Sequence, residues 1–320
     1  MAGTRSYAAG SFFFNLQGVK CGFLKAVAGG DISAEVVEEK TGPDYFTKKH
    51  IGQPKYEDIE LTIGFDMVQD VYEWIAASWK QNYSRKDGSV VVTDQSLQAK
   101  SERQFFHALI TEVGIPALDA AAKDAAYLTV KFSPEYTREV KAAGKLVMPK
   151  PSVQKRFLPS NFRLEIDGLD CTKVSRIDAF TVKQSVAADD VGDGRDVTNE
   201  PGRLDFPNLR VTLAEAGDAT WVAWFDDFVI KGDNEDSKEK SGRIVFLGPD
   251  RKQELGRIEL HNLGIFALRH PAPAAADAVS RVVAELYCER MEFQVGKPAP
   301  APPTPPAPTP IQRKPIPLPR

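Results

Sequence analysis

The 320-residue sequence has few of the residues from which reactive sites and disulfide frameworks are built. It contains only three cysteines and four histidines, and its formal net charge is −3. The cysteines, Cys21, Cys171 and Cys288, form neither an even disulfide framework nor a C-x-x-C metal pair. We therefore expect reduced, partly buried thiols. The small negative charge excludes an overall basic field that would hold nucleic acid on an outer surface.

Long apolar runs are also missing. The run Phe12 to Phe14 is followed at once by Asn15 and then Gln17, so it is too short for the hydrophobic core of a signal peptide. No stretch approaches the roughly 20 apolar residues that a membrane-spanning helix needs. We expect no membrane insertion by this chain.

The sequence lacks the common motifs of catalysis and nucleotide binding. It has no Gly-rich phosphate loop, no H-E-x-x-H and no G-x-S-x-G. His107 and His261 lie in expected strands without a nucleophile near them, and the acidic run 233–236 lacks the features of an EF-hand. The sequence predicts no catalytic residue, no cofactor-binding residue, no metal ligand and no enzyme activity, although a site assembled from distant residues stays open.

What the sequence does contain is an internal repeat. The segment Gly-Val-Lys-Cys at 18–21 reappears as Gly-Leu-Asp-Cys at 168–171, an offset of 168 − 18 = 150 residues that holds as far as Trp74. Further along, the offset becomes 261 − 107 = 154, which takes His107 onto His261. Two unrelated β-rich segments share such patterns by chance, but a constant shift over this length favours a duplication.

Apolar and polar residues alternate in both copies, which is typical of half-buried strands. One apolar stripe from Val68 to Trp79 predicts a helix, with Asp66 as its N-cap, and Asp218 occupies the same place in the second copy. We expect a mainly β fold with some α structure. It would contain two tandem copies of a small β-barrel or sandwich, each flanked by one main helix.

Composition divides the chain into four parts. We expect a first domain at 10–136, a linker at 137–160, a second domain at 161–295 and a disordered tail at 296–320. The linker is basic and interrupted by prolines, and proline recurs throughout the tail. Such a tail cannot bury a core; it is either a solvated extended chain or a docking peptide for an aromatic groove.

Two long polar stretches interrupt the alternation at equivalent places. The stretch 38–57 carries Lys48, Lys49 and Lys55, and the stretch 187–207 is acidic near its start. Polar stretches of this length usually carry function or form an interface.

These patterns together resemble a known family, the tail-tube proteins of contractile-tailed phages and related contractile injection systems. The resemblance covers about 10–136 and, in weaker form, 160–295. The residues that carry it are Phe14-x-Leu16-x-Gly18, Gly52 and Pro54, Ile59-x-Leu61-x-Ile63-Gly64, Tyr72-x-Trp74, Phe105-x-His107-Ala108-Leu109-Ile110, and the runs 116–119 and 123–130.

The resemblance implies a structural subunit of an inner tail tube, which self-assembles edge to edge into stacked rings around a channel. The familiar subunit has one such domain and this chain has two. If six domains close a ring, three chains suffice, with pseudo-sixfold symmetry. The resemblance also implies sheath and baseplate proteins as partners, DNA or an effector as cargo in the lumen, and synthesis in the bacterial cytoplasm before incorporation into a virion tail or contractile particle.

Other functions stay open alongside the tube subunit. The duplication and the proline-rich tail favour a tube-related ring component, such as a tube initiator, a terminator or a baseplate adaptor. A small-ligand-binding β-barrel is a more distant alternative, which a pocket with paired titratable groups would support.

Opposite charges on the two polar stretches suggest how rings would contact each other. In this hypothesis the stretches touch the next ring, and their charges fix which domain faces which. The residues expected at this inter-ring contact are Lys48, Lys49 and Lys55 in the first copy and Asp189, Asp190 and Asp193 in the second.

Overall fold

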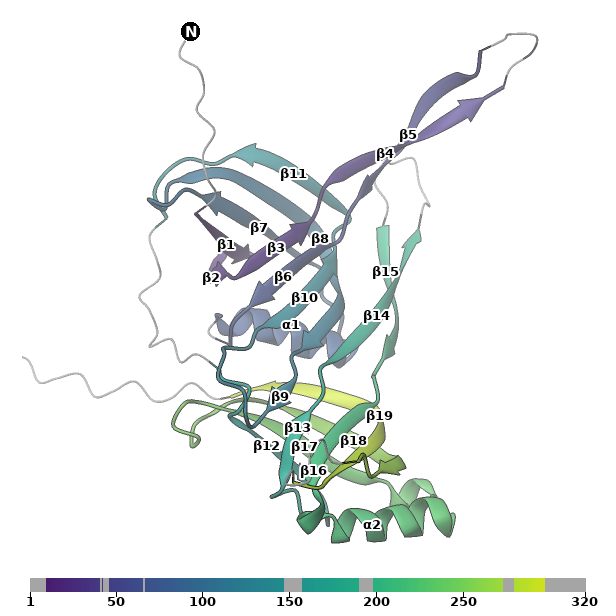
Figure 1. Cartoon of the computed structure of the whole chain (residues 1–320). Helices are drawn as coiled ribbons and strands as arrows, with labels where there is room; N and C mark the ends of the chain where they lie inside the picture. The colour runs from purple at the N-terminus through teal and green to yellow at the C-terminus, as the bar shows by residue number, and fades with distance from the viewer. Residues whose placement is uncertain are drawn as a thin grey trace, which may run out of the picture.

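The chain forms two large antiparallel sheets, drawn one above the other in Figure 1, with a helix between them. The computed structural model describes residues 10–40, 42, 46–65, 67–146, 157–189, 198–272 and 279–296. The expected mainly β fold is confirmed. Its strands form where apolar residues alternate with polar ones, as in Leu128–Ser133, where every second residue is buried.

The first sheet is built mostly from the first copy. Its strand order is β2-β1-β7-β8-β10-β6-β3, and β11 pairs with the early part of β8. The bounds are β1 (Ser11–Leu16), β2 (Val19–Leu24), β3 (Ala26–Gly29), β6 (Ile59–Ile63), β7 (Lys86–Thr93), β8 (Ala99–Ile115), β10 (Leu128–Ser133) and β11 (Tyr136–Lys141).

The second sheet repeats this order with strands from the second copy, as β12-β17-β18-β19-β16-β13. The long strand β19 occupies the position that β10 and β11 share in the first sheet. The bounds are β12 (Phe162–Ile166), β13 (Val174–Ile177), β16 (Leu209–Ala214), β17 (Lys240–Leu247), β18 (Glu254–Arg269) and β19 (Arg281–Val295).

The two halves exchange strands. The hairpin β14 (Phe180–Asp189) and β15 (Thr198–Asp205) comes from the second copy but extends the first sheet by pairing with β8. In return, β9 (Leu118–Asp119) comes from the first copy and pairs with β13 at the edge of the second sheet. Each sheet is therefore completed by a segment of the other copy, and the division into 10–136 and 161–295 describes the sequence copies rather than the two sheets.

Helices accompany both copies. The predicted first helix is α1 (Gln69–Trp79), while its expected cap, Asp66, lies outside the described residues. In the second copy, η1 (Glu215–Gly217) leads into α2 (Ala219–Phe225), which continues as η2 (Asp226–Ile230). Asp218 precedes α2 without a side-chain cap hydrogen bond. The expectation of a capping side chain there was wrong, because Asp218 already has helical backbone angles and its backbone carbonyl accepts hydrogen bonds from Trp221 and Val222.

Aromatic side chains fill the space between the two sheets. Phe157 enters from the segment joining the copies. Its ring centroid lies 4.4 Å from that of Phe65, in a tilted arrangement, and 5.5 Å from that of Phe246, edge to face. Two side chains of α1, Tyr72 and Trp79, both contact Phe293 of β19. Aromatic pairs of this kind add specific contacts to burial, so the first-copy helix joins the two sheets into one core.

Two sequence-based expectations about irregular segments need correction. The polar stretch 38–57 is largely strand, because β4 (Ile32–Glu39) and β5 (Lys48–Tyr56) form a long hairpin. The acidic stretch likewise contains β15. Strand alternation was not visible in β5 because its side chains are exposed or half-buried. The expected linker begins as strand, since β11 continues to Lys141, and residues 147–156 and 297–320 lie outside the described residues.

The strand registers also correct the offset between the copies. Ala108 pairs with Lys86, and Leu263 pairs with Lys240, so β8 matches β18 with an offset of 263 − 108 = 155. His107 therefore corresponds to Asn262, not to His261, and both residues have positive φ angles, 52° and 55°. The cause is the turn before the long strand, which spans 94–98 in the first copy and 248–253 in the second and is one residue longer there.

Candidate assembly interface

The contact between the β14–β15 hairpin and β8 is a sheet extension within one chain. Phe180 pairs with Ile115, Val182 with Val113, and the register ends at Lys183. Val182 is only 2% exposed. Pairing an added strand with an exposed sheet edge satisfies its backbone groups and buries alternate side chains, so the second copy covers the open edge of the first.

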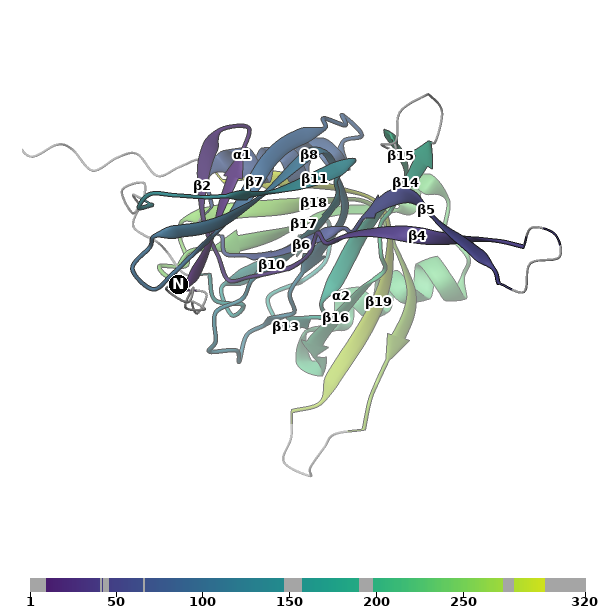
Figure 2. The same ribbon diagram turned by 90° about the horizontal axis from the view of Figure 1, so that it is seen from above.

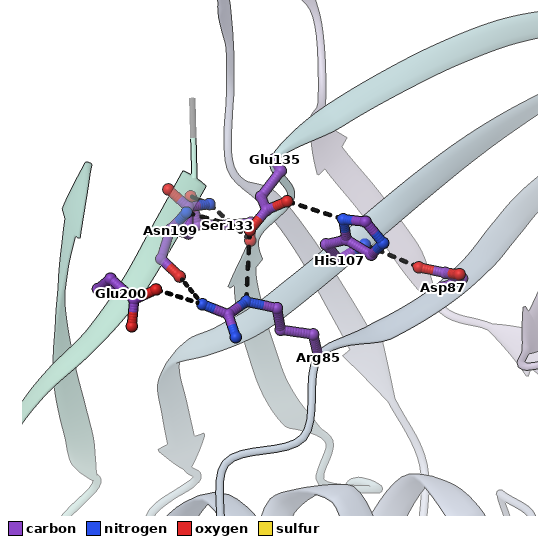
Figure 3. Close-up of polar contacts among 7 residues, drawn as sticks. All are labelled: Arg85, Asp87, His107, Ser133, Glu135, Asn199 and Glu200. Carbon is purple, nitrogen blue, oxygen red and sulfur yellow. Dashed lines mark hydrogen bonds and ion pairs between the residues drawn. The ribbon is translucent and has the colours of Figure 1, made fainter. Parts of the chain in front are cut away.

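A polar cluster holds β15 in place at the far end of this contact (Figure 3). Arg85 Nη2 donates to the backbone oxygen of Asn199 over 2.6 Å and to Glu200 Oε1 over 2.8 Å, and Arg85 Nε lies 3.3 Å from Glu135 Oε1. The backbone N–H of Asn199 donates to the same Glu135 oxygen over 3.1 Å. A carboxylate as buried as that of Glu135, at 10% exposure, is tolerated because it is paired and hydrogen-bonded.

The cluster continues from Glu135 to the bulged part of β8. His107 Nδ1 lies 2.7 Å from Glu135 Oε2, and the backbone N–H of His107 donates to Asp87 Oδ1 over 2.8 Å. The amide of Asn199 donates to the backbone oxygen of Ser133 over 3.3 Å. We call the seven residues in Figure 3 the hairpin clamp. They are Arg85, Asp87, His107, Ser133, Glu135, Asn199 and Glu200.

Contacts with α1 complete the attachment of the hairpin. Ser78 Oγ donates to Gln184 Oε1 over 2.8 Å, and both side chains are buried. Next to this bond, the ring of Trp79 meets Phe206, which directly follows β15, at a centroid distance of 6.2 Å. The hairpin is thus held by backbone pairing, by the clamp and by the end of the helix.

The β4–β5 hairpin has the same internal construction as β14–β15 but projects away from the body (Figures 1 and 2). In both hairpins the register shifts at the same place, after Ala34 in one and after Gln184 in the other. The pairs Ser33–Lys55 and Lys183–Asp205 are related by an offset of 150 on both strands. Among the described residues, β4 and β5 pair only with each other, and Ile32 is 51% exposed.

The structure places the predicted inter-ring residues as follows. Lys48, Lys49 and Lys55 all lie on β5, where Lys49 Nζ is 2.7 Å from Glu38 and Lys55 Nζ is 3.0 Å from Glu35. Asp189 ends β14, while Asp190 and Asp193 lie outside the described residues. Their role in ring stacking stays a prediction.

Sequence reasoning missed the hairpin clamp. Its residues come from segments separated by up to 115 positions, as between Arg85 and Glu200. No local motif joins them. The signal that was available is the duplication itself, because it pairs each clamp residue with a counterpart in the other copy.

The described residues offer little for chemistry. Burial, the largest cause, raises the pKa of Cys21, Cys171 and Cys288 to about 11, so their reactive thiolate forms are scarce near neutral pH. No group of three or more His, Cys, Asp or Glu side chains that could hold a metal ion occurs in the described ranges. Across the same ranges, no helix is long and apolar enough to cross a membrane.

The described residues combine a sheet extension within the chain, an exposed hairpin and two sheets of matching strand order. Comparison with known families identifies the first copy. Residues 9–138 match the family model described as T4-like virus tail tube protein gp19. The resemblance recognised in the sequence is thereby confirmed.

Several solved structures resemble less than half of this chain. The tube-terminating cap of the anti-feeding prophage is 20% identical with a TM-score of 0.39, and covers 44% of this chain and 95% of its own. A sheath–tube complex of an extracellular contractile injection system, PVC, is 20% identical with a TM-score of 0.38, and covers 43% and 93%. Hcp1 from Flavobacterium johnsoniae is 11% identical with a TM-score of 0.25, and covers 42% and 96%.

A comparison with curated proteins gives no match.

Proposed function

We propose that this chain is a structural subunit of the inner tail tube of a contractile phage tail or injection machine, and that its rings are made of alternating first and second copies. The observation that carries the proposal is the sheet extension of β8 by the β14–β15 hairpin, in a chain whose first copy matches the tail-tube family model. The junction within the chain supports the same pairing between neighbouring copies of a ring, and an exposed hairpin of the same construction remains for the next pairing.

In this proposal the product is a hollow assembly rather than a reaction. The copies at 10–136 and 161–295 act as two successive ring positions, the sheath and baseplate proteins surround the tube, and the channel is available to DNA or an effector. Six copies, contributed by three chains, close a ring with true threefold symmetry.

A tube-related ring component is the second candidate. Corresponding hairpin positions carry different charges, with Lys49 and His50 where the other copy has Asn199 and Glu200. In a ring of six copies that alternate in charge, the charges repeat with threefold symmetry although the copies are arranged with sixfold symmetry. That property suits a ring that initiates the tube, terminates it, or adapts it to a partner of lower symmetry.

Negative-stain images of the purified full chain test both candidates. We expect rings that average with three chains each, stacked into long tubes for a tube subunit and isolated or paired for an end component. Six chains per ring would contradict the alternating arrangement. A protein that stays monomeric at all concentrations and salt conditions would contradict the proposed function itself.

A further inference from the structure

The second copy has an open edge at the place where the first copy is covered. In the first copy, the last part of β8, from Glu112 to Ile115, pairs with β14. In the second copy, the pairing of β17 with β18 ends at Leu263, and in the described part of the chain no strand pairs with residues 264–269 on that side. With the offset of 155, this edge corresponds to the covered edge of β8.

Burial differs between the two edges in the direction that a missing partner produces. Val113 and Ile115 are each 1% exposed, whereas their counterpart Leu268 is half-buried and the side chain of their counterpart His270 is 54% exposed. The neighbouring Phe266 is 42% exposed. An apolar surface of this kind on a sheet edge is typical of an interaction site.

The end of the second-copy helix is uncovered as well. Trp79 is 3% exposed beneath Phe206, but its counterpart Val229 is 39% exposed and the adjacent Ile230 is 69% exposed. A cavity of about 350 Å³ lies between this helix end and the open edge. Its lining residues are Phe228, Val229, Asn234, Ile265, Phe266 and Tyr287.

The counterpart of Arg85 in the second copy is acidic. Arg85 and Glu135 correspond to Glu239 and Glu289, with an offset of 154 along β17 and β19. The Glu239 carboxylate accepts hydrogen bonds from Asn262 Nδ2 over 2.7 Å and from the Tyr287 hydroxyl over 2.6 Å. Glu239 thus occupies the position where the first copy offers an arginine to its hairpin, and Glu289 keeps the acidic character of Glu135.

The projecting hairpin carries the complementary charges. Asn199 and Glu200, which contact Arg85, correspond to Lys49 and His50 on β5, next to Lys48. Basic hairpin residues would therefore meet acidic edge residues at the second-copy edge, and Arg85 at the first-copy edge. Complementary charges steer association and suppress wrong pairings, so the hairpin favours the β18 edge.

We propose that the β4–β5 hairpin of one protomer docks on the open edge of β18 in a second copy of this chain, repeating between chains the junction that β14–β15 makes within one. The inference rests on the proposed function and specifies its contact surface. The register transfers directly, because Val182 opposite Val113 becomes Ile32 opposite Leu268. Next to this pair, Asp31 faces Arg269, and cross-strand pairs of opposite charge are favourable.

Geometry makes this contact intermolecular. The hairpin projects away from the sheet that contains β18 in both views of the molecule (Figures 1 and 2). Each chain then offers one hairpin and one edge, which are different surfaces. Such a heterologous contact produces a closed ring when the rotation per subunit closes, and a helical filament when it does not.

Disulfide trapping tests the proposed register. In the full chain carrying Ile32→Cys and Leu268→Cys, mild oxidation should give a ladder of covalent oligomers, because directly opposed residues in paired strands have the spacing that a disulfide needs. Mixing the two single variants should give covalent dimers only. Ser33→Cys with Leu268→Cys is the matched control and should crosslink at least about tenfold less, since successive strand residues point to opposite faces.

Charge exchange gives an independent readout. Glu239→Lys with Glu289→Lys should raise the protein concentration needed for assembly by about tenfold or more. Adding Lys48→Glu and Lys49→Glu to the same chain should restore assembly, a rescue that a misfolded variant would not give. Rings that form without the Ile32–Leu268 crosslink, or without the rescue, would overturn this docking and leave the proposed function standing. A wild-type chain that never assembles would overturn the proposed function and the docking with it.

Discussion

At the scale of single residues, Glu135 is the most constrained charge in the molecule's central junction. It contacts Arg85, the backbone N–H of Asn199 and the ring of His107 at once. Its side chain is 10% exposed, whereas that of Arg85 is 37% exposed. The carboxylate therefore organises the contact from within, and its partners reach it from three separate segments.

Replacing Glu135 with Gln should destabilise the native chain by about 1–3 kcal/mol, because the buried acceptor loses its charge while Arg85 and the Asn199 N–H keep their need for a partner. The midpoint of urea unfolding measures the loss. Glu139→Gln is the matched control, since Glu139 is 52% exposed in its ion pair with Arg103 and such surface pairs contribute about 0–1 kcal/mol. Equal losses in the two variants would contradict a special role for Glu135.

At the scale of elements, the hairpins β4–β5 and β14–β15 have the same construction but different surroundings. They share strand register and the position of the register shift, and they differ in what they touch. Val182 is 2% exposed and its counterpart Ile32 is 51% exposed. A sheet edge is a hazard when it stays unpaired, so the difference marks which junction the chain completes alone and which it leaves to a neighbour.

This pair of positions gives a direct comparison. In dilute monomer, Val182→Ala should lower the free energy of unfolding by about 2 kcal/mol, the cost of removing buried methyl groups and leaving a space. Ile32→Ala should change it by no more than about 0.5 kcal/mol, as is usual for exposed sites. Urea titration measures both values, and a comparable loss from Ile32→Ala in the monomer would show that the β4–β5 hairpin is already packed within its own chain.

The elements also show how far sequence reasoning reaches. Alternation in the sequence predicts strands such as β6, in which Ile59, Leu61 and Ile63 are buried. The constant offset predicts the duplication, and the apolar stripe predicts the first helix. In the β4–β5 hairpin, the alternation of Ile32, Ala34 and Val36 predicts β4, whereas β5 shows no apolar period of two because its side chains are exposed or half-buried. In the partner hairpin the sequence predicts a strand that includes part of β14. What the sequence does not predict is its pairing with β8, a strand some 70 residues away, as the pairing of Val182 with Val113 shows.

The interface residues were accessible from the sequence only in part. Lys48 and Lys49 stand out as a basic pair in a polar stretch, which is why the inter-ring hypothesis selected them. Glu239 gave no signal until the registers of β17 and β18 fixed its equivalence to Arg85. An error of one residue in the offset, from 154 to 155, changes which side chain faces the partner, because successive strand residues point to opposite faces.

At the scale of the whole molecule, the chain resembles two ring positions fused into one polypeptide. One junction is formed on folding, so its cost in translational and rotational freedom is not repeated on assembly. A ring of three chains would then need only three intermolecular junctions for six copies. Because the hairpin and the edge of each chain are different surfaces, the proposed docking would join the chains head to tail with a single polarity around the ring.

The basic pair on β5 distinguishes lateral docking from ring stacking in the whole assembly. Lateral docking on Glu239 and Glu289 predicts that Lys48→Glu with Lys49→Glu abolishes rings while the subunit keeps its unfolding midpoint, because the reversed charges would face the acidic edge. The inter-ring hypothesis predicts instead that rings of normal diameter persist and fail to stack. Electron micrographs and sedimentation of the same sample separate these outcomes. Lys123→Glu with Lys252→Glu, an equal charge change on exposed residues elsewhere, should leave both rings and stacks intact, and tubes of normal length from the β5 variant would exclude both roles for this pair.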